Sequence, residues 1–261
     1  MAKQSTAQNC LAYIDSGNIA GISHRGQVRR QNEDSFFYAL NKDHSRLIAA
    51  VADGIGGNEN GEIASRVLCK MLSCRWRKFA DSSDFTAQSV SSFLMQAIME
   101  INQALFAINS AYECGKPMGS TVAVLVVLPQ WIVTAHSGDS RIYRLRGRTF
   151  EFLTSDHSVV NELIQRGELT PEEAKTHPYA HVITRSVGPE ENMKPEIHIF
   201  DRQAGDRYLL SSDGLDLHVD PEETANILAS AADPVRAVND LLRLVLQRGA
   251  RDNVTILSVF A

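Results

Sequence analysis

The sequence predicts an α+β fold, in which antiparallel β-sheets and helices occupy separate stretches of the chain. Three observations lead to this prediction. Short apolar runs of strand length recur along the chain, and each is bounded by Gly, Asp, Asn or Pro. Two long stretches between residues 62 and 109 have helical periodicity instead and follow each other directly. Strands thus come first, then a helix pair, then more strands and a late helix, an order that favours antiparallel sheets over regular βαβ alternation.

Six segments have the composition of strands. They are rich in Val, Ile and Leu, which suit a pleated and largely buried surface, and turn residues bound them. The predicted strands cover residues 47–52, 121–128, 131–135, 141–145, 207–210 and 254–260.

Helices are predicted where apolar residues recur at steps of three and four. This spacing places one apolar face on each of the segments 62–79 and 88–109, which we expect to pack as an antiparallel pair. A third helix is predicted over 234–247, with Pro at its first position and Gly shortly after its end. Thr170 is the expected N-cap of a shorter helix that begins at Pro171.

Length and composition are those of an ordinary folded domain. The chain has 261 residues, of which 44% are hydrophobic and 22% charged. These values exclude a disordered chain, a collagen-like chain and a small disulfide-stapled protein, and the length suffices for a core without cross-links. We expect residues 1–20 to form a loosely ordered lead-in and residues 21–261 to form one catalytic domain.

Charge and targeting signals narrow the class of protein further. The chain has 26 Lys and Arg residues and 31 Asp and Glu residues, which gives a net charge of −5. No segment concentrates basic residues, so the charge pattern disfavours nucleic-acid binding. The longest apolar run, 122–128, is far shorter than the ~20 residues of a membrane span, and the first 15 residues lack the apolar core of a secretory signal. The four cysteines form no CxxC pair, so we expect reduced thiols in a cytoplasmic protein.

Acidic residues at strand ends are the most informative feature. Asp, Asn and Gly are ordinary turn residues, but the strand ends of one sheet system converge on a common edge. A carboxylate cluster without Lys in the same segments repels itself and needs cations, and oxygen ligands without Cys or His select Mg²⁺ or Mn²⁺. Two such ions roughly 4 Å apart can activate a water molecule and clamp a phosphoryl group. The five sites are Glu33-Asp34, Asp53-Gly54, Asp139, Asp213-Gly214 and Asp252-Asn253.

Seven short motifs follow one another along the chain. They are RRQNED at 29–34, DGIGG at 53–57, GST at 119–121, GDSR at 138–141, LTSDH at 153–157, SSDGL at 211–215 and DNVT at 252–255. This series resembles that of the metal-dependent (type 2C) Ser/Thr protein phosphatases in their short bacterial stand-alone form, and the resemblance covers about residues 20–261. It implies an αββα sandwich of two antiparallel sheets flanked by antiparallel helix pairs, and Mn²⁺- or Mg²⁺-dependent hydrolysis of phosphoserine and phosphothreonine in proteins.

The resemblance implies metal ligands at four of the matching aspartates and at one glycine. Asp53 corresponds to the ligand that bridges two ions, and Gly54 would donate its backbone carbonyl to one of them. Asp213 and Asp252 correspond to the ligands that complete the other site. Asp139 resembles the ligand of a third, weaker ion found in bacterial members.

Other matching residues would act on water and substrate. The resemblance implies that Glu33 and Asp34 orient water molecules around the ions. Arg29, five residues before Asp34, resembles the arginine that binds the substrate phosphate, to which its planar fork is suited. The adjacent Arg30 is expected to be a solvated surface residue. Ile55 stands where some eukaryotic members carry a His proposed as general acid, so no His is assigned that role.

Two segments between motifs remain open to interpretation. Residues 156–188 are expected to contain a flap beside the active site, of the kind that sets partner choice. His157, within this region, is expected to stabilise a turn. His177 and His181 have the spacing of helical zinc ligands, but Pro178 follows the first His, so zinc is the weaker alternative.

The remaining alternative is a catalytically silent domain that only binds phosphoproteins. Such a domain should have lost metal ligands, and this sequence has kept all of them. We therefore expect an active monomeric phosphatase that acts on phosphorylated proteins and opposes a bacterial Ser/Thr kinase and its targets, without nucleic-acid or membrane partners. A role in a type VI secretion cluster is an analogy with some stand-alone members.

Overall fold

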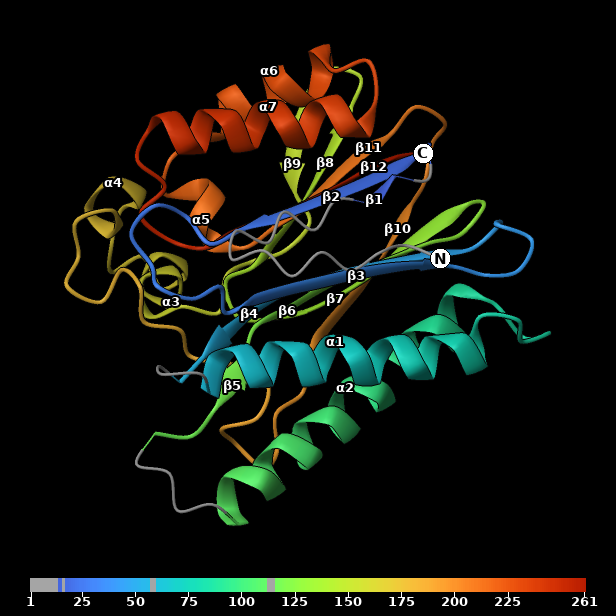
Figure 1. The fold of residues 1–261 in the computed structure, drawn as a ribbon, viewed down its shortest axis with the longest axis horizontal. Helices are drawn as coiled ribbons and strands as arrows, with labels where there is room; N and C mark the ends of the chain where they lie inside the picture. Colours follow the sequence, from blue (N-terminus) through green and yellow to red (C-terminus); the bar gives the residue numbers. More distant parts are fainter. Residues whose placement is uncertain (1–13, 16, 57–59, 112–115) are drawn as a thin grey trace.

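Two antiparallel sheets pack face to face in the computed structural model, which describes residues 14–15, 17–56, 60–111 and 116–261. Helices cover the outer face of each sheet, so the chain forms the expected αββα sandwich (Figure 1). The first sheet contains, in spatial order, β1 (Ile14–Asp15), β2 (Ile19–His24), β12 (Val254–Phe260), β11 (Arg207–Ser211), β8 (Arg141–Arg146) and β9 (Thr149–Phe152). The second contains β10 (Glu196–Asp201), β7 (Trp131–Ser137), β6 (Val122–Val127), β4 (Leu47–Ile55) and β3 (Asp34–Leu40), with β5 (Gly119–Ser120) paired to β4.

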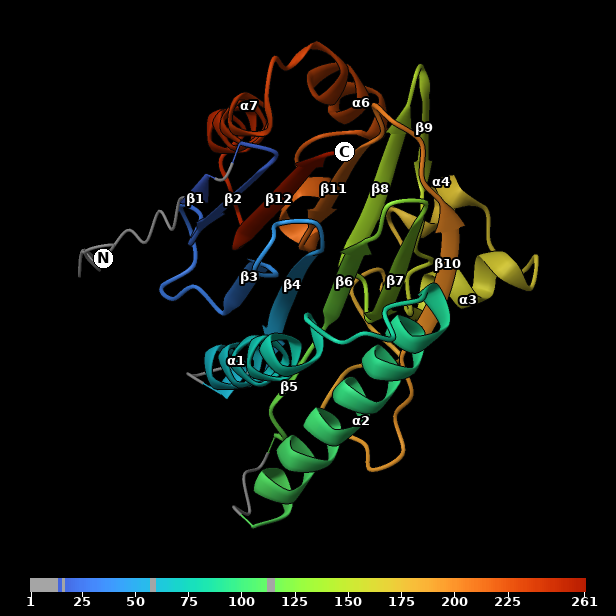
Figure 2. The ribbon, with the colours of Figure 1, turned by 90° about the vertical axis from the view of Figure 1, so that its right-hand side faces the viewer.

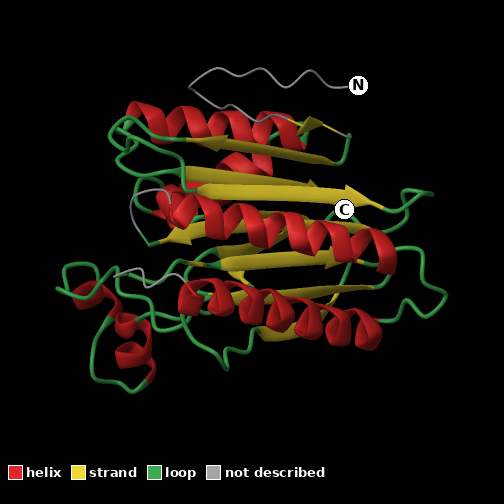
Figure 3. Cartoon of the chain, turned by 60° about the horizontal axis from the view of Figure 1, so that its bottom comes forward, coloured by secondary structure: helices red, strands yellow, loops and turns green. Residues whose placement is uncertain are grey.

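One helix pair lies on each outer face. Helices α1 (Asn60–Phe79) and α2 (Ala87–Ala111) cover the second sheet, and α2 runs back beside α1 as predicted (Figures 1 and 3). Helices α6 (Pro221–Ser230) and α7 (Pro234–Gln247) cover the first sheet (Figure 2). The sequence predicted α7 but missed α6. Three short helices, α3 (Val159–Gln165), α4 (Pro171–Ala174) and α5 (Asp213–Asp216), lie at one end of the sandwich (Figure 1).

The core has three layers because strands of both sheets are buried on both faces. In β4, Ile48 and Ala50 pack under α1 and α2, whereas Ala49 and Val51 pack between the sheets. Alternate residues of a strand point to opposite faces, so a strand buried on both sides reads as an uninterrupted apolar run. This explains why the sequence predicted β4 and β6 so clearly. A third layer lies between the first sheet and α7.

Several predicted bounds need correction. β2 begins at Ile19, inside the segment expected to be a lead-in, while residues 1–13 and 16 lie outside the described residues.

Thr170 does cap α4, and a full capping box with Glu173 is present, but the helix is only four residues long. Cys69 and Cys74 are free thiols as expected, and the other two cysteines fall outside the described residues.

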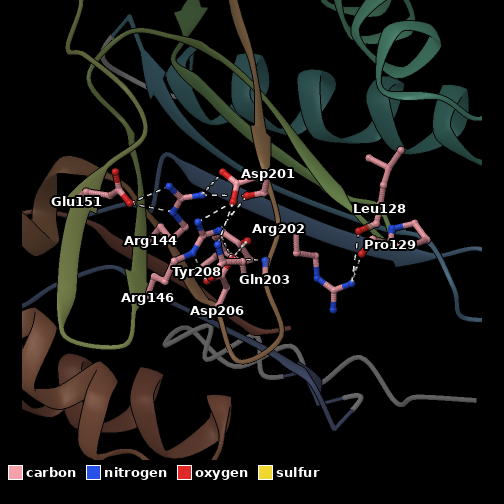
Figure 4. A network of polar contacts seen from close by, with 10 residues as sticks. All are labelled: Leu128, Pro129, Arg144, Arg146, Glu151, Asp201, Arg202, Gln203, Asp206 and Tyr208. Atoms are coloured by element: carbon pink, nitrogen blue, oxygen red, sulfur yellow. Dashed lines mark hydrogen bonds and ion pairs between the residues drawn. The ribbon is translucent and has the colours of Figure 1, made fainter.

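A polar network joins the two sheets at the end that faces away from α5 (Figure 4). Arg146 on β8 binds both carboxylate oxygens of Asp206, at 2.8 and 2.7 Å, and also binds Asp201 at the end of β10 at 2.7 Å. Burial alone would raise the pKa of the Asp206 carboxyl, but hydrogen bonds from Arg146, the Gln203 amide and Tyr208 lower it to about 2. The network therefore fastens β8 in one sheet to β10 in the other.

No helix within the described part of the chain has the length and apolar character needed to cross a membrane.

Candidate active site

The acidic residues predicted from the sequence meet at one end of the sandwich. Asp34 begins β3 and lies directly opposite Asp53 in the β3–β4 ladder. Asp53 is half-buried; desolvation raises its pKa well above the usual value, and the charges of Asp34, Asp213, Asp139 and Asp252 raise it further. Burial likewise raises the pKa of Asp213, with added repulsion from Asp139, Asp252 and Asp34. Four other carboxylates therefore act electrostatically on Asp53.

This cluster repels itself as a set of bare carboxylates. Burial raises the pKa of Asp34 to about 6, although Ser212 donates to its Oδ2 at 2.7 Å. Burial also raises the pKa of Asp139 to about 6, with Asp156 as the next cause. The Oδ1 atom of Asp34 is buried without a hydrogen-bond partner among the described residues. Divalent cations would relieve this repulsion, and an all-oxygen donor set fits Mg²⁺ or Mn²⁺.

Gly54 shows how closely β4 and α1 approach at this end. A Cβ atom on Gly54 would lie 2.1 Å from the carbonyl oxygen of Gly61 and 2.7 Å from that of Glu33, so only glycine fits. A Cβ on Gly61 would in turn lie 2.7 Å from the Gly54 carbonyl oxygen and 2.9 Å from the Glu33 Oε1. The Gly54 carbonyl oxygen and the Glu33 carboxylate oxygen therefore both lie close to the start of α1.

The GST and GDSR motifs hold the backbone of Asp53 in place. Its amide donates to Thr121 Oγ1 at 2.9 Å, and its carbonyl accepts from the Thr121 amide at 2.8 Å and from Ser120 Oγ at 3.0 Å. Thr121 Oγ1 also lies 2.6 Å from Ser140 Oγ, next to Asp139. The sequence placed these residues in motifs without assigning them a role.

Asn253 positions the segment that precedes β3. Its side-chain Nδ2 donates to the backbone carbonyl oxygens of Arg25 and Gln31, both at 2.8 Å. Its side-chain Oδ1 accepts a hydrogen bond from the backbone amide of Glu33 at 2.9 Å. One side chain adjacent to Asp252 thus fixes the loop that carries Arg29. The sequence did not assign this role, but the position of Asn253 in the DNVT motif was the available signal.

Arg29 pairs with one member of the carboxylate cluster. Its Nη2 is 2.6 Å from Asp252 Oδ2, and this hydrogen bond raises the pKa of the guanidinium. The side chain is 54% exposed, so it is accessible to a ligand from solvent. Arg30 is also exposed but borders a separate cavity, away from Asp252.

His157 stabilises a turn, in line with the expectation from the sequence. Its amide donates to the Gly138 carbonyl at 3.0 Å, and its Nδ1 accepts from the Gly138 amide at 3.2 Å. Gly138 has a φ of 106°, which favours glycine. Residues 156–188 contain α3 and α4, and Arg141 ties their start to the site through a bidentate pair with Asp156 at 2.9 and 2.7 Å.

The histidines do not favour a zinc site. His177 and His181 lie beyond the end of α4, so the helical spacing behind the zinc alternative is absent. Within the described residues, His136, His157 and Glu196 bring their ligand atoms within 4.8 Å of one another, a tighter group than the aspartates form. The two imidazole rings are stacked, with an interplanar angle of 6° and centroids 4.6 Å apart. Because a metal ion lies in the plane of each imidazole that binds it, two parallel rings cannot share one ion.

Comparisons with known proteins agree with the motifs. The sequence profile of the family described as Protein phosphatase 2C matches residues 20–254. Protein phosphatase PhpP of Streptococcus pneumoniae is 34% identical over 238 residues, which cover 91% of this chain and 95% of that protein. The structure of serine/threonine phosphatase Stp1 from Staphylococcus aureus matches with a TM-score of 0.86 and 29% identity, covering 100% of this chain and 99% of that one. The catalytic domain of the phosphatase PstP, solved with two manganese ions, matches with a TM-score of 0.80 and 30% identity, covering 93% and 96%. The chain therefore belongs to the protein phosphatase 2C family and is a serine/threonine protein phosphatase.

Proposed function

We propose that the chain hydrolyses phosphoserine and phosphothreonine in proteins with two divalent cations, Mn²⁺ or Mg²⁺, held at the end of the sandwich. The observation that carries this proposal is the convergence of the charges of Asp34, Asp139, Asp213 and Asp252 on Asp53, beside an exposed arginine that pairs with Asp252. The two manganese ions in the related PstP structure support the same stoichiometry here.

Each ion would be held by residues that already lie together. Asp53 would be shared between both ions, with the carbonyl of Gly54 completing one site and Asp213 and Asp252 completing the other. Asp139 would hold a third, weaker ion, because its charge acts on both Asp53 and Asp213. Bound divalent cations would supply an activated water molecule and positive charge against the phosphoryl oxygens.

The protein's own side chains would bind the substrate and order the water. Arg29 would exchange its bond to Asp252 for a contact with the substrate phosphoryl group. The carboxylates of Glu33 and Asp34 would accept hydrogen bonds from water molecules in the site and so fix their orientation. Since Ile55 offers no proton, the leaving serine or threonine oxygen would take its proton from a water molecule.

We further propose that the substrates are proteins phosphorylated by a Ser/Thr kinase and that the chain acts as a monomer. The names of its relatives, which are serine/threonine phosphatases, support a phosphoprotein substrate. A silent phosphoprotein-binding domain is the less favoured alternative, because all the candidate acidic ligands are present and their charges act on one another.

The test is metal-dependent hydrolysis of para-nitrophenyl phosphate and of a phosphothreonine peptide. We expect activity with Mn²⁺, none with EDTA, and near-complete loss in Asp53→Asn, Asp213→Asn and Asp252→Asn with an unchanged circular dichroism spectrum. Asp84→Asn makes the same chemical change at an exposed loop position and should be silent. Near-normal turnover in any of the three would remove that residue from the proposed ligand set.

A further inference from the structure

A cavity of about 650 Å³ lies beside the proposed active site, between the segment that precedes β3, the strand itself and the first turns of α1. These elements lie along one side of the sandwich (Figure 2). Three arginine residues line this cavity, together with residues that carry an aromatic ring and a thiol. The lining includes Arg25, Arg30, Arg66, Ser35, Phe36 and Cys69.

Two of the three guanidinium groups have no carboxylate partner among the residues that the structure describes. Arg66 pairs with Glu62, which also borders the cavity, at 2.6 Å. Arg25 donates from Nη1 to the carbonyl oxygen of Arg30 at 3.2 Å, and its Nε is buried without an acceptor among the described residues. The side chain of Arg30 is exposed, and no acidic side chain in the described part of the chain pairs with it. The lining thus carries three guanidinium groups against the two carboxylates of Asp34 and Glu62, an excess of positive charge in a protein whose net charge is −5.

The cavity shares a wall with the proposed metal centre. Asp34 borders the cavity and lies opposite Asp53 in the β3–β4 ladder. Arg29 reaches toward Asp252, whereas its neighbour Arg30 borders the cavity. Consecutive Cα atoms are about 3.8 Å apart, and an extended peptide spans roughly 3.3–3.6 Å per residue. A substrate side chain one to three positions from the phosphorylated residue would therefore reach the cavity.

We propose that this cavity is a subsite for a second anionic side chain of the substrate, either a carboxylate or a second phosphoryl group, within about three residues of the phosphorylated residue. The subsite presupposes the phosphatase activity proposed above, because Arg29 would anchor the first phosphoryl group. Two guanidinium groups offer several N–H donors that match the oxygens of one carboxylate or phosphate. Since both lie near solvent, the contact weakens as salt screens it.

The test compares three phosphothreonine peptides of equal length, with neutral flanks, with Asp and Glu flanks, or with a second phosphothreonine. We expect the wild-type protein to prefer the two anionic peptides about fivefold in kcat/KM, as a partly exposed charge pair allows. Arg30→Ala and Arg25→Ala should remove this preference and leave turnover of the neutral peptide within about twofold. Arg148→Ala, which removes the same charge from an exposed turn between β8 and β9, is the matched control and should keep the preference.

Failure of the subsite and failure of the proposed function give different results. Equal turnover of all three peptides, or an equal loss of preference in Arg148→Ala and Arg30→Ala, would overturn the subsite and leave the phosphatase activity standing. Hydrolysis of no peptide would overturn the proposed function. Fluorescence anisotropy of labelled peptides on Asp53→Asn, with and without Arg30→Ala, then still decides the subsite: tighter binding of the anionic peptides that Arg30→Ala abolishes supports it, and equal affinities refute it.

Discussion

Replacing Arg29 by alanine should weaken substrate capture much more than metal binding. The guanidinium contacts one carboxylate oxygen of Asp252 at 2.6 Å and is 54% exposed. A charge-assisted hydrogen bond is worth about 1.5–3 kcal/mol, and the exposure places this contact near the lower value. A loss of about 1.5 kcal/mol corresponds to roughly a tenfold rise in KM, because the phosphoryl charge is present before the reaction. A smaller fall in kcat should follow from misalignment.

The assay is steady-state kinetics on a phosphothreonine peptide with neutral flanks, with Mn²⁺ titrated for each variant. Arg29→Lys should recover only part of the loss, since lysine supplies the charge without the planar fork. Arg30→Ala is the control, because Arg30 borders the neighbouring cavity and should not affect a neutral peptide. If Arg30→Ala is damaging while Arg29→Ala is silent, the assignment of the phosphate-binding arginine is wrong by one residue.

Three further predictions follow from the carboxylate cluster, from Gly54 and from the polar network in Figure 4. Mn²⁺ at ~100 times its dissociation constant should stabilise the fold by about 2.7 kcal/mol relative to EDTA, and a melting temperature indifferent to both would contradict a multi-carboxylate site. Gly54→Ala should destabilise the fold severely, because the new Cβ would lie 2.1 Å from the Gly61 carbonyl oxygen. Gly167→Ala is the control: the position has open space around it, and the substitution should lower the free energy of unfolding by only about 1 kcal/mol. A denaturant titration measures both. The pKa of Asp206, lowered to about 2 from 3.8, means that its ionised form stabilises the fold above about pH 4, and that this contribution is lost as pH falls toward 2. Denaturation at pH 7 and pH 3 should show the loss, and Arg146→Gln should lower stability at pH 7 and flatten the dependence.

Elements buried on both faces or along a wide stripe were predictable from the sequence. The runs in β4, β6 and β12 and the helical periods of α1, α2 and α7 all produce strong local patterns. Helix α6 and strand β10, which have fewer buried residues, were missed. Strand β2 was missed as well, although it is almost wholly buried, because Ala20, Gly21 and Ser23 interrupt its apolar run. Only Thr224 and Leu228 of α6 are buried, although the capping box of Asp220 and Glu223 marked its start. The edge strand β10 is half exposed along its length, so it lacks the apolar run of a central strand.

The acidic residues of the site were predictable because each one adjoins a strand end with its own local signal. The residues that hold these acidic residues in place were not predictable, because their contacts join distant parts of the chain. Ser212 and Asp34 are 178 positions apart, and Asn253 and Glu33 are 220 positions apart. No periodicity or turn signal relates such pairs, so only the packing of the two sheets reveals them. The zinc alternative failed for a local reason, since α4 ends before His177.

The central claim is that the aspartates around Asp53 hold two divalent cations, and isothermal titration of the metal-free protein with Mn²⁺ tests it most directly. We expect two tight sites per chain in the wild-type protein and loss of both in Asp53→Asn, which removes the shared charge. Asp139→Asn should leave the two tight sites intact and abolish any weaker third one. An unchanged isotherm in Asp53→Asn, or a wild-type protein that binds no Mn²⁺, would contradict the account.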